Sequence, residues 1–499
     1  MSIYELMMAG AAVVFTPKVL LFICIGNIMG VIFGALPGIS ASMAVALMIP
    51  FTLTLDPVGS IAFLSAVYCS AVTGGGIPAI LFKIPGTPSS AVTTFDGYPL
   101  ACRGKAGKAL LLILVSSAFG GLVSALGMLL VSRQLSEIGL RFGPSELFAV
   151  AFLGLSVLTS MDEDKMLKTV ISGLLGLFLA TMAMDPVEGV PRLTFGSTYL
   201  LGGIPMIPAM VGMFAVSEVL KQVARPTEIK IDGTPSLKDS PMHVSFAEWW
   251  SLKWTMIRCS ILGTLVGILP GAGATIASFL GYGMEIKLSK HPEEFGNGSL
   301  TGLCASETSN NAATGGAMVP LLSLGIPGGN AAAVMVAALM LQGVQVGPLL
   351  LKSQPSYLSS VFLSMAVTNV LMVVIAVVVA KMFVKLMKIP YYFLGPLIIL
   401  FAAVGSYAAQ NNITDILVTM LAGMAGYFMI EFRYSPAALT LGLVLGDICE
   451  NNLRRAVMIT RGDVLAVFAR PITAGLMTVC VIFLLLPVIK KFLRSRRGV

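Results

Sequence analysis

The chain has 499 residues, of which 56% are hydrophobic and only 11% are charged, and its mean hydropathy is +0.91. Soluble domains carry about 25% charged residues, so a soluble protein of this size is excluded. The net charge of +8 does not indicate nucleic-acid binding, because the Lys and Arg residues lie between and after apolar runs. Membrane topology and lipid headgroups explain such residues better.

Long apolar runs recur along the chain, and a helix needs about 20 mostly apolar residues to span a bilayer. With the polar-interrupted segments added, there is room for roughly a dozen passes. The first run follows Glu5 and no basic segment, so we expect a retained membrane helix and not a cleaved signal. The sequence therefore predicts an all-α polytopic membrane protein. The runs cover residues 19–33, 109–131, 166–184, 255–269, 357–387, 393–409 and 472–489.

Few side chains are suited to metal or acid–base chemistry. The seven cysteines form no CxxC pair, and the two histidines, His243 and His291, lie in polar connectors. No P-loop of the form GxxxxGK[ST] occurs. We therefore expect no cofactor and no enzymatic activity. A membrane-embedded enzyme, the least favoured alternative, would need a nucleophile with a base or paired acids.

Two motifs recur in the same order along the chain. Residues 34–44 read GALPGISASMA and residues 267–277 read GILPGAGATIA, so that Pro270 matches Pro37 at an offset of 233. Further on, TGGGIPAILFKIPG begins at residue 73 and TGGAMVPLLSLGIPG begins at residue 314. Here TGG matches TGG at an offset of 241, and IPG matches IPG at 242. Chance is a poor explanation for two motifs in one order.

The duplication divides the chain into two transmembrane repeats, residues 1–222 and 257–499, joined by a polar connector at residues 223–256. Internal repeats with Gly/Pro-interrupted apolar segments are typical of secondary transporters. The basic segments near the C-terminus do not decide between parallel and inverted repeats. We favour inverted repeats, because inversion makes alternating access simple.

Proline and glycine should break the membrane helices at these four motifs. Broken backbone at membrane depth is tolerated only where it is buried in protein or lines a wet cavity. Each break exposes N-terminal N–H groups and partial positive charge, which suit a carboxylate. Small residues also serve close helix packing alone. Four duplicated breaks nevertheless favour broken helices or re-entrant hairpins that form a transport site at the midplane.

Residues beside the breaks offer N–H groups and hydroxyls to an anionic substrate. The alternative for each hydroxyl is a hydrogen bond back to its own helix. The candidate substrate-binding residues are Pro37, Gly38, Ser40, Ser42, Ser89, Ser90, Pro270, Gly271, Gly273, Thr275 and Asn330.

A polar stretch within residues 301–329 offers oxygen ligands to a coupling ion. Glu307 is its single acid and suits either Na⁺ coordination or proton transfer. A polar network that holds the break closed is the structural alternative. The TGG alignment makes Thr73 the counterpart of Thr314. The candidate ion-coupling residues are Thr73, Glu307, Thr308, Asn310, Asn311 and Thr314.

Longer stretches around these motifs resemble the large membrane subunit of tripartite tricarboxylate transporters, the TctA family. The resemblance rests on GILPGAGATIASFLGYGMEIKLSKHPEEFGNGSLTGLCASETSNNAATGGAMVPLLSLGIPGG, on GALPGISASMAVALMIPFT and IPGTPSSAVTTFDGYPLACRGKAGKAL, and on LGDICENNLRRAVMITRGDVLAVFARPI. It covers nearly the whole chain.

This resemblance implies a bacterial inner-membrane symporter for small di- or tricarboxylates, driven by a gradient of Na⁺ or H⁺. It further implies two partners, a small membrane subunit of the TctB type and a periplasmic solute-binding protein of the TctC type. By analogy we expect an elevator-type motion. A passive anion channel is the alternative function.

One position departs from the family pattern. The family commonly has Asn before the first IPG, whereas this chain has Lys83. A lysine at membrane depth is costly. Lys83 therefore either contacts a substrate carboxylate, or pairs with Asp96 or extends to the membrane interface. Separately, the spacing of Glu450 and Arg454 predicts an intrahelical ion pair, as architecture or as a partner contact.

Overall fold

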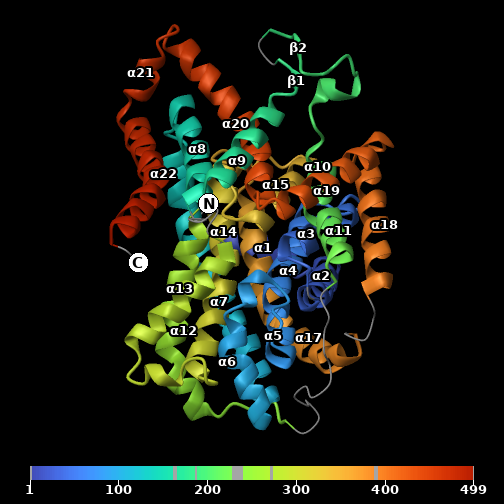
Figure 1. The fold of residues 1–499 in the computed structure, drawn as a ribbon, viewed down its shortest axis with the longest axis vertical. Coiled ribbons are helices and arrows are strands. Elements are labelled where there is room, and N and C mark those ends of the chain that lie inside the picture. The colour runs from blue at the N-terminus through green and yellow to red at the C-terminus, as the bar shows by residue number, and fades with distance from the viewer. Residues whose placement is uncertain are drawn as a thin grey trace.

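A computed structural model describes residues 3–36, 38–160, 166–185, 188–226, 240–269, 273–386 and 391–497. These residues are almost entirely helical (Figure 1). The one sheet among them is a hairpin of two short strands, β1 (Ala183–Met184) and β2 (Pro191–Arg192), which pair antiparallel. The prediction of an all-α membrane protein is confirmed in outline by this architecture.

Each half of the chain supplies a similar series of helices. Those of the first half are α1 (Ile3–Val14), α2 (Pro17–Ala35), α3 (Ala41–Thr52), α4 (Pro57–Gly74), α5 (Gly76–Phe82), η1 (Pro88–Ser90), α6 (Thr93–Leu100), α7 (Ala106–Gly139), α8 (Pro144–Ser160), α9 (Met166–Ala180), α10 (Met206–Val211), η4 (Gly212–Val216) and α11 (Ser217–Ala224). Those of the second half are α12 (Phe246–Ile268), α13 (Gly273–Leu288), α14 (Leu300–Leu324), α15 (Asn330–Leu341), α16 (Leu350–Ser353), α17 (Pro355–Leu386), α18 (Tyr391–Gln410), α19 (Thr414–Glu431), α20 (Pro436–Ile459), α21 (Val464–Phe468) and α22 (Pro471–Arg497).

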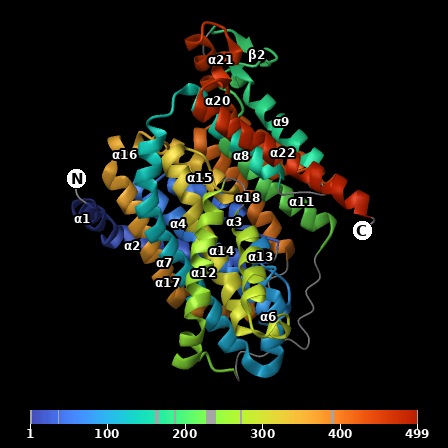
Figure 2. The ribbon, with the colours of Figure 1, turned by 90° about the vertical axis from the view of Figure 1, so that its left-hand side faces the viewer.

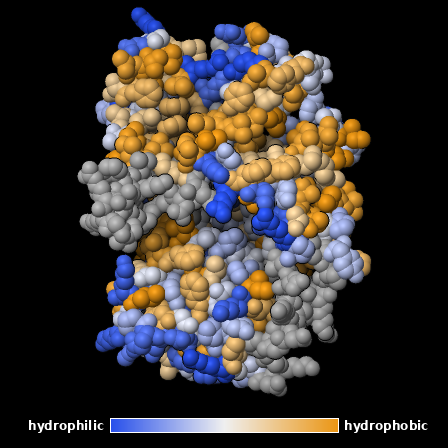
Figure 3. Space-filling model, in the orientation of Figure 1, coloured by the Kyte–Doolittle hydropathy of each residue, from blue (hydrophilic) through white to orange (hydrophobic). Residues whose placement is uncertain are grey.

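Seven segments within the described residues are helices long and apolar enough to cross a membrane. Five further apolar helices have 10 to 17 residues, among them α3 and α15, which directly follow the breaks. Apolar residues cover most of the upper half of the face in Figure 3, while hydrophilic residues gather at its lower end, near its centre and at its upper edge. The number of passes and the orientation of the repeats stay predictions.

Two helical segments form the centre of the molecule. Nearly every residue of α14 is buried, and residues 59–82 of α4 and α5 are buried throughout. Helix α14 packs against α7, α12 and α13 and lies near the middle of both ribbon views (Figures 1 and 2). Because protein surrounds α14 on all sides, its polar residues need no contact with lipid.

Glycines let α2 and α12 approach the central helices α4 and α14 closely. A Cβ added at Gly30 would lie 2.6 Å from the carbonyl oxygen of Val67, and one at Gly34 only 2.0 Å from that of Ala71. In the second half, a Cβ at Gly263 would lie 2.3 Å from the carbonyl oxygen of Ser309. No side chain fits at such distances, so α2–α4 and α12–α14 pack backbone to backbone, as small residues allow in membranes.

The glycine of each IPG motif brings the two breaks of its half together. A Cβ at Gly86 would lie 2.2 Å from the carbonyl oxygen of Gly34, just before the first LPG motif. A Cβ at Gly328 would lie 2.5 Å from that of Gly267, just before the second. The two halves therefore make the same contact at corresponding positions.

These contacts correct one detail of the internal alignment. Gly74 abuts the carbonyl oxygen of Val31, and Gly316 abuts that of Thr264. The offset between Gly74 and Gly316 is 242 (316 − 74), whereas matching TGG to TGG gives 241. By its contacts, Thr73 therefore corresponds to position 315 and not to Thr314.

Each half also supplies helices that pack on the other half. The long helix α7 contacts α12 and α14, and its counterpart α17 contacts α2 and α4. Likewise α9 packs against α20, while α19 packs against α10 and η4. This exchange joins the two repeats into one packed body around α4 and α14.

We expect Gly34→Ala to destabilise the fold, because its Cβ would collide with the backbone of Ala71. Overpacking of this kind costs about 1–3 kcal/mol or more. Gly283→Ala, where the added Cβ meets open space on α13, is the matched control. Thermal melts of the purified variants measure the effect. Equal melting temperatures for the two variants would contradict the packing described here.

Candidate functional site

A cavity of about 300 Å³, lined by both polar and apolar residues, lies where the four breaks meet. Residues that follow each break contribute to its lining. They are Ser40, Ala41, Ser42, Thr87, Pro88, Ser89, Gly273, Ala274, Thr275, Ile276, Gly329, Asn330 and Ala331, joined by Tyr68 and Val72 of α4. None of these lining residues carries a charge.

The first turns of three helices, α3, α13 and α15, line this cavity. Helix α3 begins after Ser40, whose hydroxyl accepts a hydrogen bond from the Met43 N–H at 3.2 Å. Helix α15 begins after Gly329, which provides no side-chain cap. Helix N-termini carry unsatisfied N–H groups and partial positive charge. Three of them at one cavity make its interior suited to an anion without any basic side chain.

Local backbone shape explains why the breaks turn into the cavity. Gly273, at the start of α13, has φ of +63°, which L side chains rarely adopt. A Cβ added at Gly329 would lie 3.5 Å from the Cα of Gly273, so the two breaks of the second half lie against each other. In the first half, the Thr87 hydroxyl bonds those of Ser89 at 3.0 Å and Ser90 at 3.1 Å.

Six of the candidate substrate-binding residues line the cavity together: Ser40, Ser42, Ser89, Gly273, Thr275 and Asn330. Ser90 is fully buried behind it, where its hydroxyl bonds Thr87 and the carbonyl of Val72. Gly38 lies outside the lining, and its nearest side chains are Glu218 and Gln222 of α11. Pro37, Pro270 and Gly271 lie outside the described residues.

Sequence reasoning missed Tyr68, Thr87 and Gly329 among the lining residues. Thr87 and Gly329 each directly follow an IPG motif, so the motif itself was a usable signal. Tyr68 lies on α4 and carries no local signal, because only the packing of α4 beside the breaks brings it to the cavity.

Lys83 does not line the cavity. It ends α5 in the left-handed conformation with φ of 57°, is exposed, and holds its Nζ 5.7 Å from the centre of the Tyr98 ring. Asp96 instead accepts hydrogen bonds from the N–H groups of Gly298 and Ser299, each at 2.8 Å, and from the Tyr282 hydroxyl at 2.9 Å. Of the alternatives for Lys83, the pair with Asp96 is therefore wrong.

Glu307 is fully buried on α14, and all its hydrogen-bond donors are neutral. The Thr93 hydroxyl of α6 donates to Oε1, the Ser117 hydroxyl of α7 donates to Oε2 at 3.0 Å, and the Asn310 amide donates to Oε2 at 3.3 Å. No ion pair among the described residues includes Glu307. A buried carboxylate without a cationic partner is costly, so this position calls for a proton or a bound cation.

The other candidate ion-coupling residues are also fully buried. The Asn311 amide donates to the carbonyl of Ser117 and to Oδ1 of Asn369, both at 2.8 Å. Thr314 is bonded to the carbonyl of Asn311 at 2.7 Å, and Thr308 lies 3.7 Å from the Cys304 sulfur. Thr73 Oγ1, Asn310 Oδ1 and Asn311 Oδ1 have no hydrogen-bond partner. The polar network predicted as the structural alternative is thus only partly satisfied.

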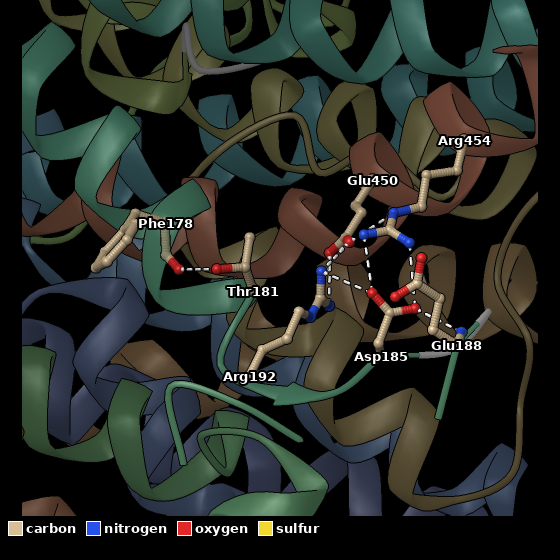
Figure 4. A network of polar contacts seen from close by, with 7 residues as sticks. All are labelled: Phe178, Thr181, Asp185, Glu188, Arg192, Glu450 and Arg454. Carbon is tan, nitrogen blue, oxygen red and sulfur yellow. Dashed lines mark hydrogen bonds and ion pairs between the residues drawn. The ribbon is translucent and has the colours of Figure 1, made fainter. Parts of the chain in front are cut away.

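The predicted pair of Glu450 and Arg454 is present, with Arg454 Nε 2.9 Å from Glu450 Oε1. It belongs to a larger network that ties the β1–β2 hairpin to α20 (Figure 4). Arg192 of β2 donates to both oxygens of Glu450, and Arg454 Nη2 lies 2.9 Å from Asp185 Oδ2. Each of the two carboxylates, of Asp185 and Glu450, contacts both arginines. Because every charge in this group is paired, the network serves to hold the hairpin on α20.

The sequence matches the family described as "Tripartite tricarboxylate transporter TctA family" over residues 20–441. The chain is 38% identical over 478 residues to an "Uncharacterized 52.8 kDa protein in TAR-I ttuC' 3'region" of Agrobacterium vitis. The matched region covers 95% of this chain and 95% of that protein. It is also 42% identical over 231 residues to an "Uncharacterized protein in TAR-II ttuC' 3'region" of the same organism, covering 46% of this chain and 96% of that protein. No solved structure matches the chain.

We expect Glu307→Gln to stabilise the protein at pH 9 in a choline buffer free of alkali cations, because it removes a buried charge that has no cationic partner. Glu285→Gln is the control, since Arg258 donates two hydrogen bonds of 2.8 Å to the equally buried Glu285. That control should lose about 1–3 kcal/mol. Thermal melts compare the two variants, and destabilisation of both to the same extent would contradict an unpaired Glu307.

Proposed function

The chain belongs to the tripartite tricarboxylate transporter TctA family, and from this premise we propose that it is the large permease subunit that carries small di- or tricarboxylates across the bacterial inner membrane. The substrate binds in the cavity between the four breaks. A gradient of Na⁺ or H⁺ drives uptake through Glu307. A small TctB-type membrane subunit and a periplasmic TctC-type solute-binding protein complete the transporter.

One observation carries the substrate assignment: the first turns of α3, α13 and α15 line the same cavity. Their N–H groups and dipoles favour a carboxylate, and Ser42, Thr275 and Asn330 add neutral donors. A site without fixed positive charge holds an anion firmly enough to bind it and weakly enough to release it. The volume of about 300 Å³ is at the lower end for ligand pockets, which supports a small substrate.

The buried position of Glu307 supports an ion-driven mechanism. Without a proton or a cation, its charge has only neutral donors around it, which is unfavourable at membrane depth. The ion and the substrate share structural elements, because Thr93, which donates to Glu307, follows the cavity-lining segment Thr87–Ser89 by four residues. Binding of one ligand therefore orders a segment that the other also uses.

Uptake of labelled di- and tricarboxylates into cells tests this proposal. The chain is co-expressed with its TctB-type and TctC-type partners, and Na⁺ is replaced by choline or a protonophore is added. We expect uptake of at least one carboxylate. This uptake should require the binding protein and should collapse on one of the two treatments, removal of Na⁺ or removal of the proton gradient. Uptake that survives loss of both gradients would indicate a channel, and no carboxylate uptake would overturn the substrate class.

We expect Thr275→Val to raise the KM for the transported carboxylate about 5- to 10-fold, because it removes one hydroxyl donor from the cavity while keeping the side-chain shape. Lys83→Asn is the matched control and should leave the KM unchanged, since Lys83 lies outside the cavity. Concentration-dependent uptake measures both variants. A shift for Lys83→Asn with none for Thr275→Val would place the substrate elsewhere.

A further inference from the structure

Two contacts fix the register between α4 and α14. The sulfur of Cys69 lies 3.3 Å from the hydroxyl of Thr314. Seven residues later, at the start of α5, which continues α4 beyond the single residue Gly75, a Cβ added at Gly76 would lie 3.1 Å from Glu307 Oε1. Because the residue number rises from α4 into α5 while it falls along α14, the two segments run antiparallel.

This register sets Thr73 and Asn310 at the same level. Thr73 follows Cys69 by four residues and precedes Gly76 by three, so it shares their face of the helix. Asn310 precedes Thr314 by four residues and follows Glu307 by three, so it shares theirs. The two side chains therefore belong to one interface, between the Cys69–Thr314 contact and the Glu307 carboxylate.

Both residues carry a fully buried oxygen that lacks a partner, Thr73 Oγ1 and Asn310 Oδ1. An unsatisfied buried acceptor costs about 1–3 kcal/mol, and native structures contain few of them. Two neutral oxygens and one carboxylate in the same interface form a set of ligands that suits a hard cation.

We propose that the interface of α4 and α14 binds one dehydrated Na⁺ through Glu307, Asn310 and Thr73. The carboxylate balances the charge of the ion, and the amide and hydroxyl oxygens replace its water. A proton would satisfy Glu307 alone and would leave the oxygens of Thr73 and Asn310 without partners. This inference rests on the proposed function for its role in transport, while the site itself follows from the contacts of α4 and α14.

The site is connected to the substrate cavity through α4. Val72 lines the cavity and accepts a hydrogen bond from Ser90 at 3.4 Å, and Thr73 is the next residue along the chain. On the other side, Thr93 joins Glu307 to the segment after the first IPG motif. A cation held at this interface therefore fixes one wall of the cavity and adds positive charge near an anionic substrate.

The first test measures Na⁺ binding by the purified full chain without any carboxylate. Thermal melts are recorded in choline buffer at increasing concentrations of NaCl or KCl, since a ligand of the folded state raises the melting temperature. We expect Na⁺ to stabilise the wild type at concentrations where K⁺ does not. Equal effects of both salts, or stabilisation by acid pH alone, would overturn the Na⁺ site.

The second test compares variants that remove one oxygen and keep the shape. We expect Thr73→Val and Asn310→Leu each to raise the Na⁺ concentration for half-maximal stabilisation by about tenfold or more. Two controls should leave it unchanged: Ser309→Ala, whose hydroxyl bonds the carbonyl of Ala305, and Thr440→Val, whose hydroxyl bonds that of Pro436. If Asn310→Leu does not fold, Thr73→Val alone decides.

The outcomes separate this inference from the proposed function. Na⁺ stabilisation that Thr73→Val weakens, in a chain that takes up no carboxylate, would overturn the function and keep the cation site. Carboxylate uptake with an unchanged Na⁺ response in Thr73→Val and Asn310→Leu would overturn the site and keep the function.

Discussion

Backbone polar groups at membrane depth must find partners within the protein or its ligands, and this constraint governs the molecule. Each LPG and IPG motif interrupts the helical backbone inside the packed body, and the first turn after it exposes N–H groups that lipid cannot satisfy. The structure gathers the first turns of α3, α13 and α15 at one cavity, where a polar solute can reach them. The same property that makes the breaks costly in lipid makes them suited to hold a carboxylate.

Close helix packing is what makes this gathering possible. Glycines at equivalent places in the two halves bring α2 onto α4 and α12 onto α14 at backbone distance. Gly86 and Gly328 then bring each IPG break into contact with a backbone carbonyl just before the LPG break of the same half. Because α7 and α17 each pack on the opposite half, the two pairs of breaks meet. Duplication thus supplies a cavity that neither half could form alone, with polar α14 shielded from lipid at its centre.

Much of the candidate site could be predicted from the sequence because its information is local. A proline–glycine break and the hydroxyls after it are read within a few residues, and Ser42, Ser89 and Thr275 do line one cavity. The partners of Glu307 could not be predicted, because Thr93 and Ser117 lie 214 and 190 residues away in the chain.

Matching TGG to TGG also paired Thr73 with a residue one position away from its structural counterpart, since packing and not letter identity fixes the helix register. Lys83 was predicted as a possible substrate contact, but it lies outside the cavity, at the left-handed end of α5. The boundaries and orientation of the repeats stay predictions.

The central claim is that backbone N–H groups and neutral side chains between the breaks hold the substrate. A structure determined by electron cryomicroscopy, with a transported carboxylate bound, tests it most directly. We expect density for the anion between the first turns of α3, α13 and α15, within hydrogen-bond distance of Ser42, Thr275 or Asn330. Density for the carboxylate at a basic side chain such as Lys83, with the cavity between the breaks left to water, would contradict it.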